Sequence, residues 1–212
     1  MKTFLLIDDH EVVRSGIGTL LSTLFIGPQV EEAGNADAAI EKLKLHQYDL
    51  VMMDVQIPGC DMLGLMEFIH TRYPETKVLI FSMSAENIYA KRFLIAGAKG
   101  FLPKDASFEE MKKAITLVLN NKRYISENLT EVLADECLSD NSTSPFTKLS
   151  SREFEIASIL LSGQTSSDLG KTLNLSPSSV GTYKKRVFDK LGVKNLLELN
   201  ELATTYDFIK KT

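Results

Sequence analysis

FLLIDD, residues 4–9, joins a run of four apolar residues to a pair of acids, and each of three later apolar runs is followed by a polar residue. Those three polar residues are Asp54, Ser82 and Lys104. The four runs cover residues 4–7, 50–53, 78–81 and 100–102. They are short and apolar on both faces, which is typical of buried parallel strands.

Helical patterns occupy the intervals between these runs, and a fifth strand is expected near residues 29–33. The helices are expected at residues 11–24, 36–45, 63–73, 86–96 and 108–120. Strands that alternate with helices in this way predict an α/β fold with a doubly wound, five-stranded parallel sheet. We assign this domain to residues 1–122.

Polar groups just beyond the carboxyl ends of parallel strands meet in one crevice, where such sheets bind ligands. The residues expected there are Asp8, Asp9, Asp54, Ser82 and Lys104. Three carboxylates in one pocket repel each other unless a hard cation joins them, and an all-oxygen site suits Mg²⁺. The Lys104 ammonium and the Ser82 hydroxyl can bind phosphoryl oxygens, so the pattern predicts phosphoryl transfer to Asp54 as the nucleophile. Ordinary strand-end polarity would explain any one of the five residues, but not all five in this order.

The composition is that of a soluble globular protein, because 44% of the 212 residues are apolar and 25% are charged. No apolar stretch approaches the roughly 18 residues of a membrane span, and the first residues do not form an export signal. We therefore expect a cytoplasmic protein with no membrane partner. Cys60 and Cys137 are expected as free thiols, and the three scattered histidines as surface or helix-end residues.

A polar segment divides the chain in two. Residues 139–145 have almost nothing to bury, and a short amphipathic helix is expected just before them, over residues 126–137. We assign residues 123–147 to a linker, which serves either as a hinge between separable domains or as a passive tether. Residues 148–212 then form an all-α domain of four helices, whose start signals lie at Ser150, Thr165, Ser176 and Asn195.

The second and third of these helices are joined by a short turn at residues 174–176, which predicts a helix-turn-helix. Residues 148–212 also carry a net charge of +3, whereas residues 1–147 carry −7. A charged helix face is usually only solvated, but short polar side chains at a helix start can reach base edges while lysines contact phosphates. The candidate contacts to double-stranded DNA are Ser178, Ser179, Thr182, Tyr183, Lys184, Lys185 and Lys190.

These motifs carry a family resemblance over nearly the whole chain. The N-terminal domain resembles a two-component receiver domain, with its flavodoxin-like fold, through IDDH at residues 7–10, DVQIPGCD at 54–61, FS at 81–82 and GAKGFLPK at 97–104. The C-terminal domain resembles the LuxR-type DNA-binding domain through LSSRE at residues 149–153, LS at 175–176 and KLGV at 190–193. Together the two domains resemble a response regulator of the NarL/FixJ type.

The resemblance implies that Asp54 accepts its phosphoryl group from a sensor histidine kinase. It also implies that Asp9, Asp54 and the backbone carbonyl of Gln56 bind Mg²⁺, with Asp8 assisting through water. Ser82 and Phe101 match the family's switch pair of a hydroxyl and an aromatic side chain.

At Phe101 an alternative interpretation stays open, and at Met83 and Gly181 the sequence departs from the family pattern. Phe101 also fits simple core packing. Met83 follows the switch hydroxyl where a smaller residue often occurs, and we hypothesise that it screens the acyl phosphate from water. Gly181 stands in the recognition helix where lysine is frequent, which removes one potential DNA contact.

We therefore expect a phosphorylation-controlled, DNA-binding transcription regulator rather than an enzyme. It should act as a homodimer, because one helix-turn-helix covers only a few base pairs. One alternative is a receiver-type interaction module and DNA-binding protein regulated without phosphorylation, whose mark would be loss of Asp9, Ser82 or Lys104; the chain has all three. A metal-dependent phosphatase would need an insertion that covers its substrate, and the loop at residues 55–61 is too short for one.

Overall fold

The computed structural model describes residues 1–83, 86–127, 129–131, 144–163, 165, 168–170, 173 and 175–206, with the backbone alone at 86–88 and 151. Contacts divide the chain into two compact units, Met1–Glu131 and Val132–Thr212. The first unit therefore extends beyond the boundary expected at residue 122. Within the described ranges, none of the helices has the length and apolar character needed to cross a membrane.

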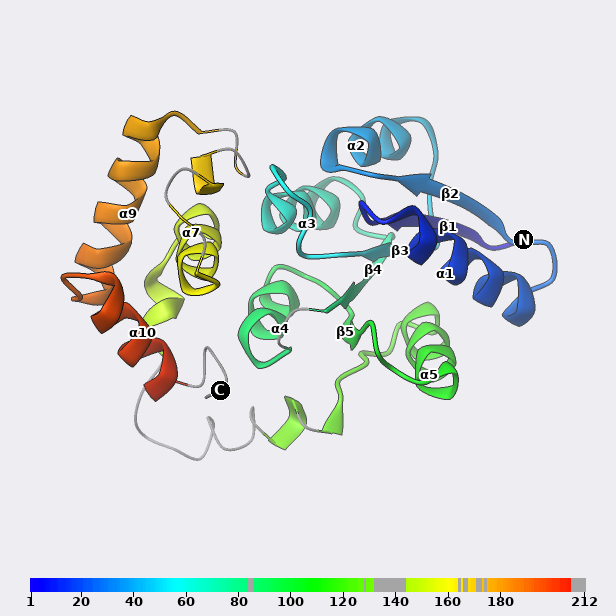
Figure 1. Cartoon of the computed structure of the whole chain (residues 1–212). Helices are drawn as coiled ribbons and strands as arrows, with labels where there is room; N and C mark the ends of the chain where they lie inside the picture. Colours follow the sequence, from blue (N-terminus) through cyan, green and yellow to red (C-terminus); the bar gives the residue numbers. More distant parts are fainter. Residues whose placement is uncertain are drawn as a thin grey trace. The chain divides into compact units, whose positions relative to one another are not determined.

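The first unit is built on a parallel five-stranded sheet with the strand order β2-β1-β3-β4-β5 (Figure 1). The strands are β1 (Thr3–Ile7), β2 (Gln29–Ala33), β3 (Leu50–Met53), β4 (Lys77–Ser82) and β5 (Gly100–Pro103). The chain winds in opposite directions on the two sides of β1, so the carboxyl ends of β1 and β3 border the crevice where such sheets bind ligands. The expected α/β fold is confirmed, and every strand end lies within one residue of its predicted position.

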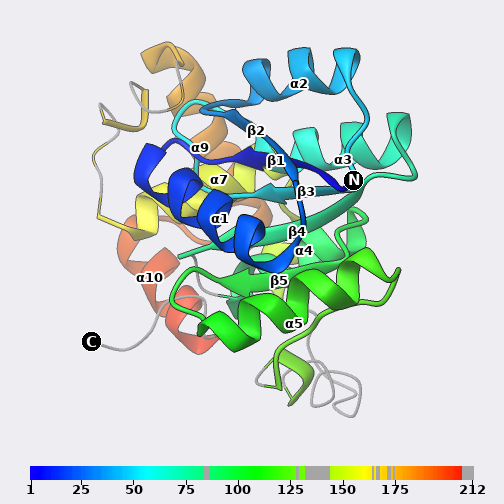
Figure 2. The ribbon, with the colours of Figure 1, turned by 90° about the vertical axis from the view of Figure 1, so that its right-hand side faces the viewer.

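Five helices connect the strands and cover the sheet. They are α1 (Glu11–Leu24), α2 (Ala36–Leu45), α3 (Met62–Arg72), α4 (Glu86–Ile95) and α5 (Phe108–Leu119). Figure 2 shows α1 and α5 on the same face of the sheet. Leu21 of α1 and Ile115 of α5 belong to one hydrophobic core together with Leu6 and Met52 of the central strands. This core fixes the positions of β1 and β3, and so of Asp8 and Asp54, which directly follow these two strands.

After α5 the chain returns along the edge of β5. Tyr124 forms a parallel bridge with Gly100, and its backbone N–H donates to the Lys99 carbonyl over 2.9 Å. A Cβ at Gly100 would lie 2.7 Å from the Tyr124 carbonyl oxygen, so this close approach requires glycine. Leu129, in the helical stretch that follows, is 1% exposed. The rest of the short helix expected at 126–137, and most of the linker, fall outside the described residues.

The second unit is helical where it is described. It contains the 3₁₀ helix η1 (Pro145–Lys148) and the helices α7 (Ser151–Leu161), α9 (Pro177–Leu191) and α10 (Leu196–Thr205). The side chains of Ser150, Ser176 and Asn195 each accept a hydrogen bond from the backbone three residues on, which confirms three of the predicted helix starts. Thr165 forms the reciprocal bonds of a capping box with Asp168, although much of the helix that it starts lies outside the described residues.

Candidate functional site

Asp54 follows β3 directly, and its carboxylate is bound by side chains from the ends of two other strands. Ser82 Oγ donates to Asp54 Oδ1 over 2.6 Å, and Lys104 Nζ donates to Asp54 Oδ2 over 2.7 Å. The backbone N–H of Gln56 also donates to Oδ1, over 3.2 Å. Asp54 is 5% exposed and Ser82 1% exposed. The predicted convergence of strand-end residues on Asp54 is therefore present, and both carboxylate oxygens are engaged.

Lys104 joins Asp54 to a second buried acid. Its Nζ lies 2.5 Å from Asp8 Oδ2, and the side chains of Lys104 and Asp8 are only 9% and 3% exposed. Burial alone lowers the pKa of Lys104, but the hydrogen bonds and the Coulombic attraction to Asp54 and Asp8 raise this pKa by more. The ammonium therefore stays charged and offsets the repulsion between the two acids.

The acids after β1 lie in different environments, since Asp8 is 2% exposed and the Asp9 side chain 31% exposed. His10 Nδ1 lies 2.9 Å from Asp9 Oδ1 and 3.2 Å from Asp8 Oδ1. These three residues offer ligand atoms within 4.8 Å of one another, close enough to hold a metal ion. His10 does lie at the start of a helix with its side chain 66% exposed, as expected, but its contacts with both acids were not predicted.

Arg14 is a further residue that sequence reasoning missed. From α1 its guanidinium donates to the Asp8 backbone carbonyl over 2.7 Å and to the Glu32 carboxylate over 2.8 Å. It thereby ties the end of β1 to β2. An arginine one turn into a helix has no distinctive pattern, so nothing in the sequence marked it.

Other predicted residues surround this centre without touching the carboxylate through their side chains. Phe101 is fully buried in β5, so core packing accounts for its position. The side chain of Gln56 donates to the Tyr89 hydroxyl at 3.5 Å. Met83 is 71% exposed, so it does not cover the site as the shielding hypothesis requires.

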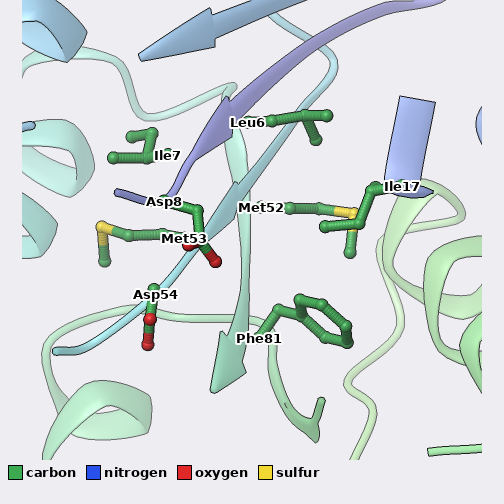
Figure 3. Close-up of a pocket in the computed structure, with 8 residues that line it drawn as sticks. All are labelled: Leu6, Ile7, Asp8, Ile17, Met52, Met53, Asp54 and Phe81. Carbon is green, nitrogen blue, oxygen red and sulfur yellow. The ribbon is translucent and has the colours of Figure 1, made fainter. Parts of the chain in front are cut away.

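Apolar side chains surround the two buried acids, Asp8 and Asp54, where these follow their strands (Figure 3). The space bordered by Asp8, Asp54 and six apolar side chains is too small to hold a water molecule. Figure 3 shows Leu6, Met52, Ile17 and Phe81 on one side of the strands, and Ile7 and Met53 on the other. These closely packed apolar residues keep water away from Asp8 and Asp54, and the exclusion of water strengthens the electrostatic interactions of the two acids.

The start of α9 presents an ordered group of hydroxyls. Ser176 Oγ lies 2.9 Å from both Ser178 Oγ and Ser179 Oγ, and Thr182 Oγ1 donates to the Ser178 carbonyl over 2.9 Å. Ser178 and Thr182 are exposed. The predicted DNA-facing hydroxyls therefore share one helix start and already have hydrogen-bond partners within it.

The basic side chains of α9 have different partners. Lys184 Nζ lies 5.6 Å from the centroid of the Phe188 ring, and Arg186 lies over the Tyr183 ring at 5.8 Å. Lys185 is exposed and has no hydrogen-bond or ion-pair partner within the part of the chain that the structure describes. Among the predicted phosphate contacts, Lys185 therefore has an ammonium that could bind a phosphate without first losing a partner among the described residues.

Lys190 has a structural partner that the sequence did not reveal. Its Nζ lies 2.6 Å from Glu153 Oε2, and the Glu153 side chain is 5% exposed. The same Glu153 oxygen accepts the Ser150 backbone N–H over 2.8 Å in the capping box of α7. Lys190 therefore joins the end of α9 to the start of α7, in addition to any contact with DNA.

Comparison with known proteins agrees with both sets of motifs. The family model for the response regulator receiver domain matches residues 4–116, and the model for bacterial regulatory proteins of the luxR family matches residues 147–203. Each match contains one of the two sites described above.

Relatives match along almost the full length. The response regulator GacA of Pseudomonas protegens is 34% identical over 99% of this chain and 98% of its own, and the response regulator UvrY of Escherichia coli is 33% identical over 96% and 94%. A similar solved structure is RcsB from Salmonella enterica serovar Typhimurium, bound to promoter rprA in the presence of the phosphomimetic BeF₃⁻. It matches 96% of this chain and 100% of its own with a TM-score of 0.66 and 21% identity, which shows a shared fold. The resemblance seen in the sequence is therefore confirmed: the chain belongs to the two-component response regulators, DNA-binding transcription regulators that join a receiver domain to a LuxR-type DNA-binding domain.

Proposed function

We propose that Asp54 accepts a phosphoryl group from a sensor histidine kinase, and that this modification shifts the protein toward a dimer that binds operator DNA. The observation that carries the proposal is the pair of contacts to the buried Asp54 carboxylate, from Ser82 Oγ at 2.6 Å and Lys104 Nζ at 2.7 Å. A hydroxyl and an ammonium so placed can bind the oxygens of a phosphoryl group on Asp54.

In the transfer, an Asp54 oxygen attacks phosphorus and forms a P–O bond while the P–N bond to the kinase histidine breaks. The electron pair of the broken bond stays on the departing imidazole nitrogen. Lys104 and Ser82 would then exchange their contacts with the carboxylate for contacts with phosphoryl oxygens. Because Lys104 keeps its positive charge, it can neutralise part of the charge that the phosphoryl group brings.

The acids beside Asp54 suit a bound Mg²⁺. The carboxylates of Asp8, Asp9 and Asp54, with the Gln56 carbonyl, would supply an all-oxygen donor set in place of the present contacts of Asp8 and Asp9 with His10, and the 31% exposure of the Asp9 side chain leaves room for the waters that this ion retains. When bound, Mg²⁺ would neutralise negative charge on the acids and the phosphoryl oxygens.

Ser82 and Phe101 are proposed to pass the change on to the surface of the receiver. The Ser82 hydroxyl donates to Asp54, and the Phe101 ring is 0% exposed. Both side chains therefore point into the receiver domain, which we call the inward arrangement. A switch then requires that an outward arrangement of the two be populated in the absence of the phosphoryl group.

On the DNA side, we propose that α9 enters the major groove. Ser178, Ser179, Thr182 and Tyr183 would approach base edges, and Lys184, Lys185 and Lys190 would contact phosphates. The exposed hydroxyls at the start of α9 support this orientation, as does the ammonium of Lys185, which has no partner among the described residues. Two copies in a homodimer would supply two half-sites.

Intact-mass spectrometry tests the covalent step. Full-length protein is incubated with Mg²⁺ and acetyl phosphate, and wild type is compared with Asp54→Asn. Asp37→Asn, on the exposed first turn of α2, is the matched control. Wild type and Asp37→Asn should gain one phosphoryl group and Asp54→Asn none. Equal labelling of Asp54→Asn, or no labelling of wild type, would refute Asp54 as the acceptor.

A further inference from the structure

Gly181 is the fifth residue of α9 and is exposed. Glycine inside a helix is destabilising, because its unfolded backbone has more freedom to lose than that of any other residue. Its φ is not among the positive values of this chain, so the backbone conformation does not require glycine. No atom of the described residues lies within 4 Å of a Cβ built at Gly181, so internal crowding does not require it either.

Two other glycines of the same unit have clear internal reasons. Gly192 ends α9 with φ 70°, a left-handed conformation that side chains rarely adopt. At Gly170 a Cβ would lie 3.2 Å from the Leu175 backbone oxygen. Gly181 differs from both, so packing among the residues that the structure describes gives no reason for a glycine there.

The neighbours of Gly181 on the helix surface are the residues proposed to contact DNA. Ser178 lies three residues before Gly181 and Lys185 four residues after it, so the three share one face. Helical side chains lean toward the helix N-terminus, so Lys185 lies over the turn that contains Gly181. The face therefore has a stretch of backbone without a side chain, between the ordered hydroxyl of Ser178 and the ammonium of Lys185, which has no partner within the described ranges.

We propose that Gly181 is a steric determinant of DNA recognition: the missing side chain lets the backbone of α9 approach the duplex closely, and any side chain there would hold the helix away. A glycine that its own fold does not need is explained where backbone must approach a ligand closely. Closer approach would bring Ser178 and Thr182 within reach of base edges. The inference rests on the proposed placement of α9 in the major groove.

The test separates stability from DNA binding by adding one methyl group. Full-length wild type, with Mg²⁺ and acetyl phosphate, is first used to select a duplex from a random-sequence pool. The affinity of Gly181→Ala for that duplex is then measured, together with its melting temperature. Gly181→Ala should raise the melting temperature of the second unit by about 4 °C, because alanine is the better helix former. It should nevertheless bind the selected duplex about tenfold more weakly, because a well-packed interface does not accept an extra methyl group.

Gly16→Ala is the matched control, since Gly16 is an exposed interior glycine of α1 that also has no atom of the described residues within 4 Å of an added Cβ. It should stabilise the first unit and leave DNA affinity unchanged. Equal or tighter DNA binding by Gly181→Ala would overturn the inference and leave the proposed function intact. A lower melting temperature would also overturn it, because the glycine would then have a role inside the protein. Failure of wild type to select any duplex would refute the proposed function itself.

Discussion

Replacing Lys104 by methionine should destabilise the first unit by about 3 kcal/mol. The substitution keeps an unbranched side chain but removes an ammonium that lies 2.5 Å from Asp8 Oδ2 and 2.7 Å from Asp54 Oδ2. Removing one partner of a buried ion pair typically costs about 3–5 kcal/mol. Each acid retains another donor, the His10 backbone N–H for Asp8 and the Ser82 hydroxyl for Asp54, so the lower end of that range applies.

Mg²⁺ should restore much of this loss. In Lys104→Met the two buried acids lack their cation, so a divalent ion should bind them more tightly than in wild type and stabilise the variant by at least about 1 kcal/mol more. Native-state hydrogen exchange of the β1 and β3 amides, with and without Mg²⁺ at constant ionic strength, measures the stability of this unit alone. Lys112→Met, at an exposed position of α5, is the control. If Lys104→Met were as stable as the control, or if Mg²⁺ stabilised both equally, our account of the charge balance would be wrong.

Three further predictions concern acid stability, salt dependence and phosphoryl lifetime. Burial raises the pKa of Glu153, but hydrogen bonds from Lys190 and Ser150 lower it by more, so the folded-state pKa lies below the ordinary value of 4.5. The stability that this carboxylate contributes is present above pH 4.5 and is lost as the pH falls through the folded-state pKa. Glu153→Gln should therefore lower the free energy of unfolding by about 1–2 kcal/mol at neutral pH, and this difference should vanish in acid. Urea denaturation of both proteins across pH measures it. Lys185→Ala should reduce the slope of log affinity against log salt concentration by about 0.9, and an unchanged slope would exclude a phosphate contact. Because Met83 is 71% exposed and does not cover Asp54, Met83→Ala should lose its phosphoryl group at the wild-type rate, and a faster loss would contradict this conclusion and favour the shielding hypothesis.

The buried sheet and its edge were predictable because their signals are local. Each central strand is a short run that is apolar on both faces, and a polar residue follows it at once. Parallel pairing of β1 with β3 then places Asp8 beside Asp54 without any further information. The contact of Lys104 with both acids follows from the same topology, since β5 ends on the same edge of the sheet.

Contacts made by long side chains across elements were not predictable. Lys190 binds Glu153 across 37 positions of sequence, and the charge pattern of α9 alone could not show that this lysine has an internal partner. The wide spacing of His10 from the other histidines does not reveal its partners, which are the two acids just before it. The bridge between Tyr124 and Gly100 depends on how the chain returns after α5, which no short motif records.

The central claim is that a phosphoryl group on Asp54 controls DNA binding. Its most direct test is the affinity of full-length protein for a selected duplex, with and without Mg²⁺ and fluoroberyllate, for wild type and Asp54→Asn, together with the oligomeric state by light scattering. We predict that the phosphomimetic shifts wild type toward a dimer and tightens binding by about tenfold, within the range of ordinary allosteric couplings, and leaves Asp54→Asn unchanged. The same response in both proteins, or no response in wild type, would contradict the account and favour a receiver regulated without phosphorylation.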